Sequence, residues 1–104
     1  MLIVTTESVP GKNLQTLGIV KGSVVQAKHI GRDIMAGLKS IVGGELRGYT
    51  DLMDEARRIA TERMQDEAKA MNADAIVCFR YNSSAVMDGA CEIMAYGTAV
   101  KFVS

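Results

Sequence analysis

The residues most able to carry chemistry in this sequence are two cysteines, Cys78 and Cys91, and a single histidine, His29. A cysteine pair can form a disulfide, perform redox chemistry or bind a metal ion. Asp33 follows His29 by four positions, so if the first predicted helix began early enough to include His29, the two side chains would share one face and could bind a borderline metal together. Cys78, Cys91, His29 and Asp33 are therefore the candidate metal ligands.

The two cysteines are predicted to lie far apart within one chain. Asp88-Gly89 is a strong signal for a two-residue turn between two strand-like runs, 75–87 and 90–103. Such a hairpin separates Cys78 from Cys91 by roughly eight residues along the ladder, or about 26 Å at ~3.3 Å per residue. A disulfide needs Cα atoms within about 7 Å, so we expect none within the chain. The two thiols are then either buried small residues of the sheet or ligands that act across a subunit interface.

The sequence fixes no set of catalytic residues. The run Gly37-Leu38-Lys39-Ser40 superficially resembles the end of a P-loop, but it lies inside a helical pattern and does not follow a strand. A single histidine offers no Ser–His–Asp or Cys–His arrangement by sequence alone. The carboxylates are scattered, and none are paired by spacing as an acid and a base. These patterns favour a binding protein, and an enzyme whose site is assembled from several subunits is the alternative.

The charge of the chain argues against nucleic acid or an anionic membrane as a partner. Twelve basic and twelve acidic residues give a formal net charge of zero, so no electrostatic attraction for a polyanion is expected. No apolar run reaches the length of a membrane span, and the N-terminal residues lack the basic region of a signal peptide. We therefore expect a single domain covering residues 1–104, cytoplasmic, with reduced cysteines.

Hydrophobic periodicity predicts two helices and several strands. Apolar positions at helical spacing indicate a short helix over 31–42 and a long helix from residue 50 or 51 to residue 71, with Asn72 in the left-handed conformation at its end. Gly18 and Gly22 lie in a predicted N-terminal hairpin and mark a bulge or a close backbone approach. The predicted strands cover 2–6, 17–20, 24–27, 75–87 and 90–103.

The long helix is predicted to have one apolar and one charged face. The charged face carries residues spaced for ion pairs, each contributing a few tenths of a kcal/mol, which is typical of a solvated surface. The expected pairs are Asp54–Arg58, Arg58–Glu62 and Arg63–Glu67. The expected inward stripe is Leu52, Ala56, Ile59, Ala60, Met64, Ala68 and Met71.

The order of strands, helices and a long hairpin is typical of an α+β fold. We expect a largely antiparallel sheet with a short and a long helix packed on one face. Two small helices cannot cover both faces of strands this long, so apolar side chains remain that further copies of the chain would bury. The sequence thus predicts a homo-oligomer.

Short motifs, in order along the chain, resemble the YbjQ-like family, whose name refers to heavy-metal binding. They are Leu17–Gly22, Arg32-Asp33, Ile41–Gly44, Tyr49, Glu55–Arg57, Ala73–Val77 and Tyr96–Lys101. The resemblance covers essentially the whole chain. It implies an α+β fold, a subunit that forms a ring, a homopentamer, and a transition or heavy metal ion as the ligand. Most of the shared positions are glycines or small apolar residues, which specify turns and packing.

Three functions fit these observations. The first is a binding module that holds a small ligand or metal ion at the interfaces of a homo-oligomeric ring. The second is an enzyme acting on a small molecule, with His29, Arg32 or Asp33 supplied by adjacent subunits. The third is a binder of soft metals or metalloids that uses Cys78 or Cys91 across an interface.

Overall fold

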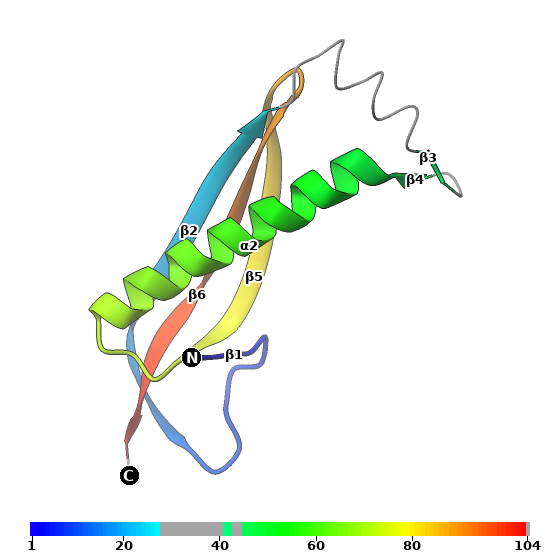
Figure 1. Ribbon diagram of the computed structural model, residues 1–104. Coiled ribbons are helices and arrows are strands. Elements are labelled where there is room, and N and C mark those ends of the chain that lie inside the picture. The colour runs from blue at the N-terminus through cyan, green and yellow to red at the C-terminus, as the bar shows by residue number, and fades with distance from the viewer. Residues whose placement is uncertain (28–40, 43–44, 104) are drawn as a thin grey trace.

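The computed structural model describes residues 1–27, 41–42 and 45–103. Its elements are β1 (Leu2–Ile3), β2 (Asn13–Ala27), β3 (Ile41–Val42), β4 (Glu45–Leu46), α2 (Arg47–Ala70), β5 (Ala75–Met87) and β6 (Ala90–Val103). Four strands form a mixed sheet in the order β1-β5-β6-β2, and β3 pairs with β4 separately. Figure 1 shows α2 crossing one face of the long strands, where it contacts β2 and β6 most extensively.

The C-terminal hairpin has the bounds that the sequence predicts. Met87 pairs with Ala90 around the turn, and Gly89 adopts the positive φ of 76° that a two-residue turn requires. Two irregularities interrupt the ladder, one after Val77 and one after Ala85. Bulges of this kind redirect side chains along a strand, and here they place the two cysteines in different surroundings.

The prediction of an N-terminal hairpin is wrong, because a single strand, β2, runs from residue 13 to residue 27 and pairs with β6 along its length. The predicted bulge is confirmed between Thr16 and Gly18. Gly22 lies in no turn. A Cβ atom there would overlap backbone atoms of Ala60 and Met64, so glycine is required by the close approach of α2 to the strand.

Helix α2 packs on the sheet through side chains four residues apart. Ala56, Ala60, Met64 and Ala68 are fully buried, as the inward stripe predicts. Three of these four are alanines, and their small size allows the helix backbone to approach β2 closely. The helix begins at Arg47, earlier than predicted, so no acidic side chain lies in its first turn. It ends at residue 70, and Asn72 has the predicted left-handed conformation with φ of 58°.

Two parts of the predicted fold class need correction. The described residues contain one helix, so the prediction of a short and a long helix does not match. Most of the range 31–42 lies outside the described residues, and its last two residues form β3, where β-branched Ile41 and Val42 pair with β4. The sheet is antiparallel across β2–β6 and β5–β6, whereas β1 joins the edge of β5 in parallel. It is therefore a mixed sheet.

The sheet face opposite α2 is covered by the N-terminal segment at one end. A second apolar cluster forms there from Ala75, Val77 and Val100, against which Val4, Val9 and Leu14 pack. Further along β2, Ile19 in the middle of the strand and Val25 near its end are 76% and 57% exposed. The radius of gyration is 17.0 Å, against about 13 Å for a compact domain of this length. The chain is thus thin and elongated, with apolar surface outside its own core.

Candidate functional site

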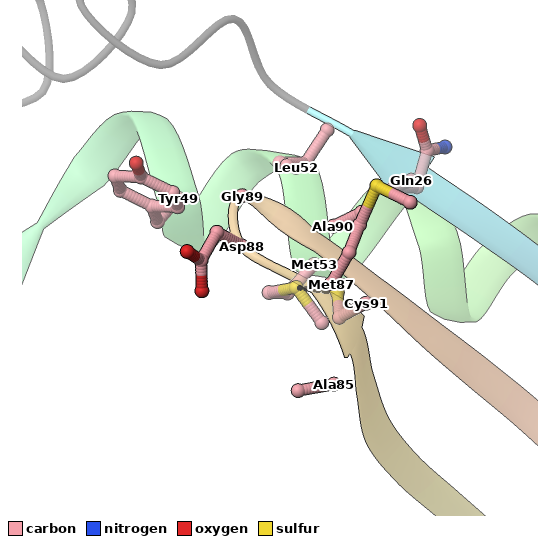
Figure 2. Close-up of a pocket in the computed structure, with 10 residues that line it drawn as sticks. All are labelled: Gln26, Tyr49, Leu52, Met53, Ala85, Met87, Asp88, Gly89, Ala90 and Cys91. Atoms are coloured by element: carbon pink, nitrogen blue, oxygen red, sulfur yellow. Dashed lines mark hydrogen bonds between the residues drawn. The ribbon is translucent and has the colours of Figure 1, made fainter.

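A cavity of about 380 Å3 lies at the turn end of the β5–β6 hairpin, beside the first turns of α2. Sheet pairing builds its floor, because Cys91 on β6 pairs with Gln26 on β2 and with Ala85 on β5. Figure 2 shows the lining side chains, most of which are apolar. They are Gln26, Tyr49, Leu52, Met53, Ala85, Met87, Asp88, Gly89, Ala90 and Cys91.

Two sulfur atoms meet in this cavity. The Sγ atom of Cys91 lies 3.6 Å from the Sδ atom of Met53, in a contact where the thiol donates to the thioether. Cys91 comes from β6 and Met53 from α2, and both residues are half-buried. Two sulfur atoms bound at ~2.3 Å to one tetrahedral metal ion would lie about 3.8 Å apart. The spacing of the sulfur pair (Cys91 and Met53) therefore suits a shared soft ion as well as a thiol hydrogen bond.

Cys78 has a different environment from Cys91. It lies in the β5 bulge with a φ of 55°, and its backbone N–H donates to the carbonyl oxygen of Thr6 at 3.0 Å. Its side chain packs beside the second apolar cluster, whereas Cys91 contacts α2. Both thiols are free. The structure thus does not bring the two predicted cysteine ligands together within the chain.

The predicted His29–Asp33 pair, like Arg32, lies outside the described residues. In residues 1–27, 41–42 and 45–103, no group of three or more His, Cys, Asp or Glu side chains could hold a metal ion. A metal that prefers nitrogen or oxygen ligands therefore has no complete ligand set in that part of the chain. The sulfur pair supplies two soft donors, fewer than the four ligands of a closed tetrahedral site.

The charged face of α2 is held by ion pairs among its own side chains. Arg58 contacts Glu55 at 2.6 Å and Glu62 at 2.7 Å, and the second of these pairs is as predicted. The hydrogen bond from Arg58 lowers the pKa of the Glu55 carboxyl below its ordinary value. Asp54 pairs with Arg57 rather than with Arg58. All these groups are well exposed, and this face behaves as a solvated surface.

Two side chains of α2 reach past this face to the backbone of β2. The carboxylate of Glu67 accepts a hydrogen bond from the N–H of Lys21 at 3.2 Å. The guanidinium of Arg63 donates to the carbonyl oxygen of Ser23 at 2.6 Å. The sequence predicts an Arg63–Glu67 ion pair, and the structure instead directs both side chains to β2. These contacts satisfy backbone groups on the outer edge of the sheet, which otherwise could pair with another strand.

Along much of β5, the opposite edge of the sheet has no neighbouring strand among the described residues. Strand β1 pairs only with Ala75 and Ile76, and the last N-terminal backbone bond to β5 is from Phe79 N–H to the oxygen of Val4. From residue 80 to residue 87 every residue is exposed. Beyond Phe79, β6 is the one strand in the described part of the chain that pairs with β5.

Sequence reasoning identified Cys91 but not its neighbours in the cavity. Met53 was recognisable only as one of seven methionines, and its position on α2 lies beside the predicted inward stripe. The continuous strand β2 is what brings Gln26 beside Cys91. An unusually high methionine content was the one signal of a sulfur-rich site, and it carries no information on which residues meet.

Helix α2, the helix in the described part of the chain, is too polar to span a membrane.

Known proteins of one family match this chain over almost its whole length. Residues 1–103 match the family profile described as "Putative heavy-metal-binding" (YbjQ). A UPF0145 protein of Alkaliphilus metalliredigens is 60% identical over 103 residues, which is 99% of this chain and 100% of that protein. A UPF0145 protein of Thermotoga maritima is 57% identical over 102 residues, covering 97% and 96% of the two chains.

One solved structure has a similar fold. It is a crystal structure of a protein of unknown function, of the family DUF74, from Pediococcus pentosaceus. The TM-score is 0.65 at 18% sequence identity, and the match covers 99% of this chain and 98% of the other. At this identity the similarity concerns the fold alone.

Proposed function

Because this chain belongs to the YbjQ family, we propose that it is a homo-oligomeric module that binds a small ligand or a metal ion at its subunit interfaces. The family resemblance favours a ring of five subunits. We place the protein in the cytoplasm, where Cys78 and Cys91 would stay reduced. The observation that carries the proposal is the edge of β5 from residue 80 to residue 87, which is exposed and has β6 as its one neighbouring strand among the described residues.

An unpaired strand edge offers backbone donors and acceptors that a strand from another chain can satisfy. Proteins that stay monomeric protect such edges with charges, bulges or covering elements. On the β2 edge, Glu67 and Arg63 provide that protection at Lys21 and Ser23. Between Tyr81 and Ala85, ahead of the bulge that follows Ala85, the exposed residues of β5 are uncharged, so this part of the edge is the better site for a second copy.

The shape of the protomer supports the same conclusion. A radius of gyration of 17.0 Å, well above the ~13 Å of a compact domain, leaves much of the chain at the surface. Val86 and Met87 on β5 are 50% and 69% exposed, and Ile19 on β2 is 76% exposed. Exposed apolar side chains in such number near strand edges are typical of surfaces that associate. Association would bury them.

The cavity borders the proposed interface. Ala85 and Met87 line it and also lie on the open segment of β5. A second copy that pairs with this edge would close the cavity from one side and shield its contents from water. Ligand sites between subunits commonly form in this way, from walls that neither subunit completes alone.

Native mass spectrometry of untagged protein, purified without a chelator, tests the proposal by reporting the subunit number and any bound mass together. Val86→Lys places a charge on the open edge and should shift the protein toward monomer, because a buried unpaired lysine is costly. Met71→Lys, at a 40% exposed site after α2, is the matched control and should leave the assembly unchanged.

Three outcomes are informative. An oligomer that dissociates on Val86→Lys and carries a reproducible extra mass supports the proposal. A wild-type protein that is monomeric at micromolar concentration contradicts it. An oligomer that Val86→Lys leaves intact shows that the β5 edge is not the interface.

A further inference from the structure

We propose that Tyr81 is a positioning residue of the subunit interface, and that the backbone groups of Tyr81, Ser83 and Ala85 are the ones that bond to a strand of a second copy. This inference rests on the proposed function and names the groups through which the β5 edge would associate. It combines the register of the sheet with two linked hydroxyl groups that join β5 to α2.

The register of the sheet fixes which backbone groups of β5 face outward. In an antiparallel pair, successive residues direct their N–H and C=O groups alternately toward the partner strand and away from it. The N–H of Phe79 donates to the carbonyl oxygen of Val4, on the side of β5 away from β6. The pairing with β6 is unbroken from Arg80 to Ala85, so every second residue after Phe79 also faces away from β6. These outward residues of β5 are Tyr81, Ser83 and Ala85.

The contacts of β2 give the same assignment independently. The N–H of Lys21 in β2 donates to the Glu67 carboxylate and so points away from β6. Lys21 pairs with Tyr96, so the backbone groups of Tyr96 face β5, where Tyr96 pairs with Arg80. Arg80 therefore bonds to β6, and so does every second residue after it. The residues between them are the outward residues.

The side chain of Tyr81 ties this edge to α2. Its hydroxyl lies 2.8 Å from Oγ1 of Thr61, and this Oγ1 donates to the carbonyl oxygen of Arg57 at 2.7 Å. The Thr61 hydroxyl has a single hydrogen, which it donates to that carbonyl, so Tyr81 is the donor to Thr61. The ring of Phe79 packs edge-on against the ring of Tyr81, with centroids 4.7 Å apart. The Tyr81 side chain is thus held both at its hydroxyl and at its ring.

This tie matters because α2 otherwise contacts β5 little. The helix packs mainly on β2 and β6, and far less on β5. Without the Tyr81 bond, β6 alone among the described strands would hold β5 from residue 80 to residue 85. An edge that is less well ordered must be ordered when a partner binds, and that cost opposes association. Tyr81 therefore prepares the edge before a second copy arrives.

The partner that fits this edge is a second copy and not an isolated peptide. The exposed side chains from Tyr81 to Ala85 carry no charge that would select a charged peptide. A peptide on β5 would leave Ile19 and Val25 of β2 in water, where they are 76% and 57% exposed. A second copy brings a whole sheet and helix, and an assembly of such copies can bury apolar side chains of more than one strand.

Hydrogen exchange in the assembled wild-type protein tests the backbone assignment. Exchange is quenched at set times and read residue by residue by NMR in an aprotic solvent. The amides of Asn82 and Ser84, which bond to β6, are internal controls and should exchange slowly. The amides of the outward residues should exchange as slowly in the assembly. In Val86→Lys, which is expected to favour the monomer, only the outward amides should exchange faster, by at least about tenfold, because an exposed amide opens at almost no cost.

Tyr81→Phe tests the positioning role, because it removes only the hydroxyl and keeps the ring beside Phe79. Loss of one hydrogen bond changes an equilibrium constant roughly two- to tenfold. The protein concentration at which half of the assembly dissociates should therefore rise by about that factor, and Thr61→Val should have the same effect. Tyr96→Phe is the matched control, at a 38% exposed tyrosine on the other face of the sheet, and should dissociate as the wild type does. Thermal unfolding of each variant establishes that it is folded.

The outcomes separate this proposal from the previous one. A wild-type protein that is monomeric contradicts the proposed function and, with it, the interface assigned here. An oligomer whose outward amides exchange as fast as those of a free edge keeps the assembly and overturns the docking groups. If Tyr81→Phe and Tyr96→Phe dissociate at the same concentration, the positioning role of Tyr81 is wrong.

Discussion

Gly22 is the position where a single added methyl group should damage the fold most. It lies on β2 beneath α2, and a Cβ there would overlap the carbonyl oxygen of Ala60 and the amide nitrogen of Met64. Its distance to the Cβ of Arg63 would be 2.7 Å. Two of these three obstacles are backbone atoms of a packed helix, which cannot rotate aside. Gly22→Ala therefore requires α2 to move away from the sheet.

The size of that movement gives the expected loss of stability. Carbon atoms in ordinary contact are about 3.5 Å apart, so the helix must retreat by at least about 0.8 Å, the movement needed at Arg63, where the distance would be 2.7 Å. A gap of that size forfeits roughly a quarter to a half of the dispersion energy of the separated atoms. Overpacking typically costs about 1–3 kcal/mol, and we expect the upper value because the clash is with backbone. Replacing glycine by alanine in a strand returns up to about 1 kcal/mol of backbone entropy.

The expected net loss for Gly22→Ala is therefore about 2 kcal/mol, or a fall in Tm of about 8–16 °C for a domain of this size. Urea unfolding followed by circular dichroism, at one fixed protomer concentration, measures the free energy of unfolding. Lys21→Ala is the control, because this exposed neighbour points away from α2 and its replacement should change stability by less than about 0.5 kcal/mol. If Gly22→Ala unfolds at the same urea concentration as Lys21→Ala, the close approach of helix and strand is wrong.

Three further predictions concern single contacts. Arg58→Gln should raise the pKa of Glu55 back toward its ordinary 4.5, which an NMR titration of the carboxyl carbon would measure. Because the folded-state pKa is lowered, the pair stabilises the protein above about pH 4.5 and loses that effect as the pH falls through the folded-state pKa. An unchanged pKa of Glu55 in the variant would refute the contact. Asn72→Val should destabilise the folded protein by about 1–2 kcal/mol, because a β-branched residue resists the φ of 58°. Asn72→Gly should leave the stability nearly unchanged. Equal thermal unfolding temperatures for the two variants would contradict the left-handed conformation of residue 72. Glu67→Ala should cost about 1 kcal/mol and accelerate hydrogen exchange at the Lys21 amide, whose bond to the carboxylate is lost; unchanged exchange at that amide would exclude the contact in solution.

The hairpin and the long helix could be predicted because their signals are local. Asp88-Gly89 supplies a turn whose backbone geometry only a few residue types adopt, and the runs on either side are long and β-branched. The spacing of Ala56, Ala60, Met64 and Ala68 is helical whatever they pack against, and all four are buried. Asn72 ends the helix because its own side chain tolerates positive φ. The helix start was less well determined, since no capping residue marks Arg47.

Strand β2 was predicted as a hairpin because glycine occurs both in turns and where two backbones approach closely. In the sequence Lys21-Gly22-Ser23 between β-branched runs, the glycine is typical of a turn. In the fold, it is required because α2 passes directly over it. That requirement involves residues 60–64, about 40 positions away, which no local pattern can reveal. The same limitation applies to Arg63 and Glu67, which have ion-pair spacing but bind β2.

The sequence alone therefore determined the elements with local causes: the C-terminal hairpin, the apolar stripe of α2, the bulge at Gly18, and the family. It also indicated that the two cysteines do not pair within a chain. Only the tertiary structure decided which groups meet, because the contact of Cys91 with Met53 depends on how α2 lies across β6. The same holds for the unequal edges of the sheet, since a strand edge is open or covered according to its neighbours in space and not according to its own residues.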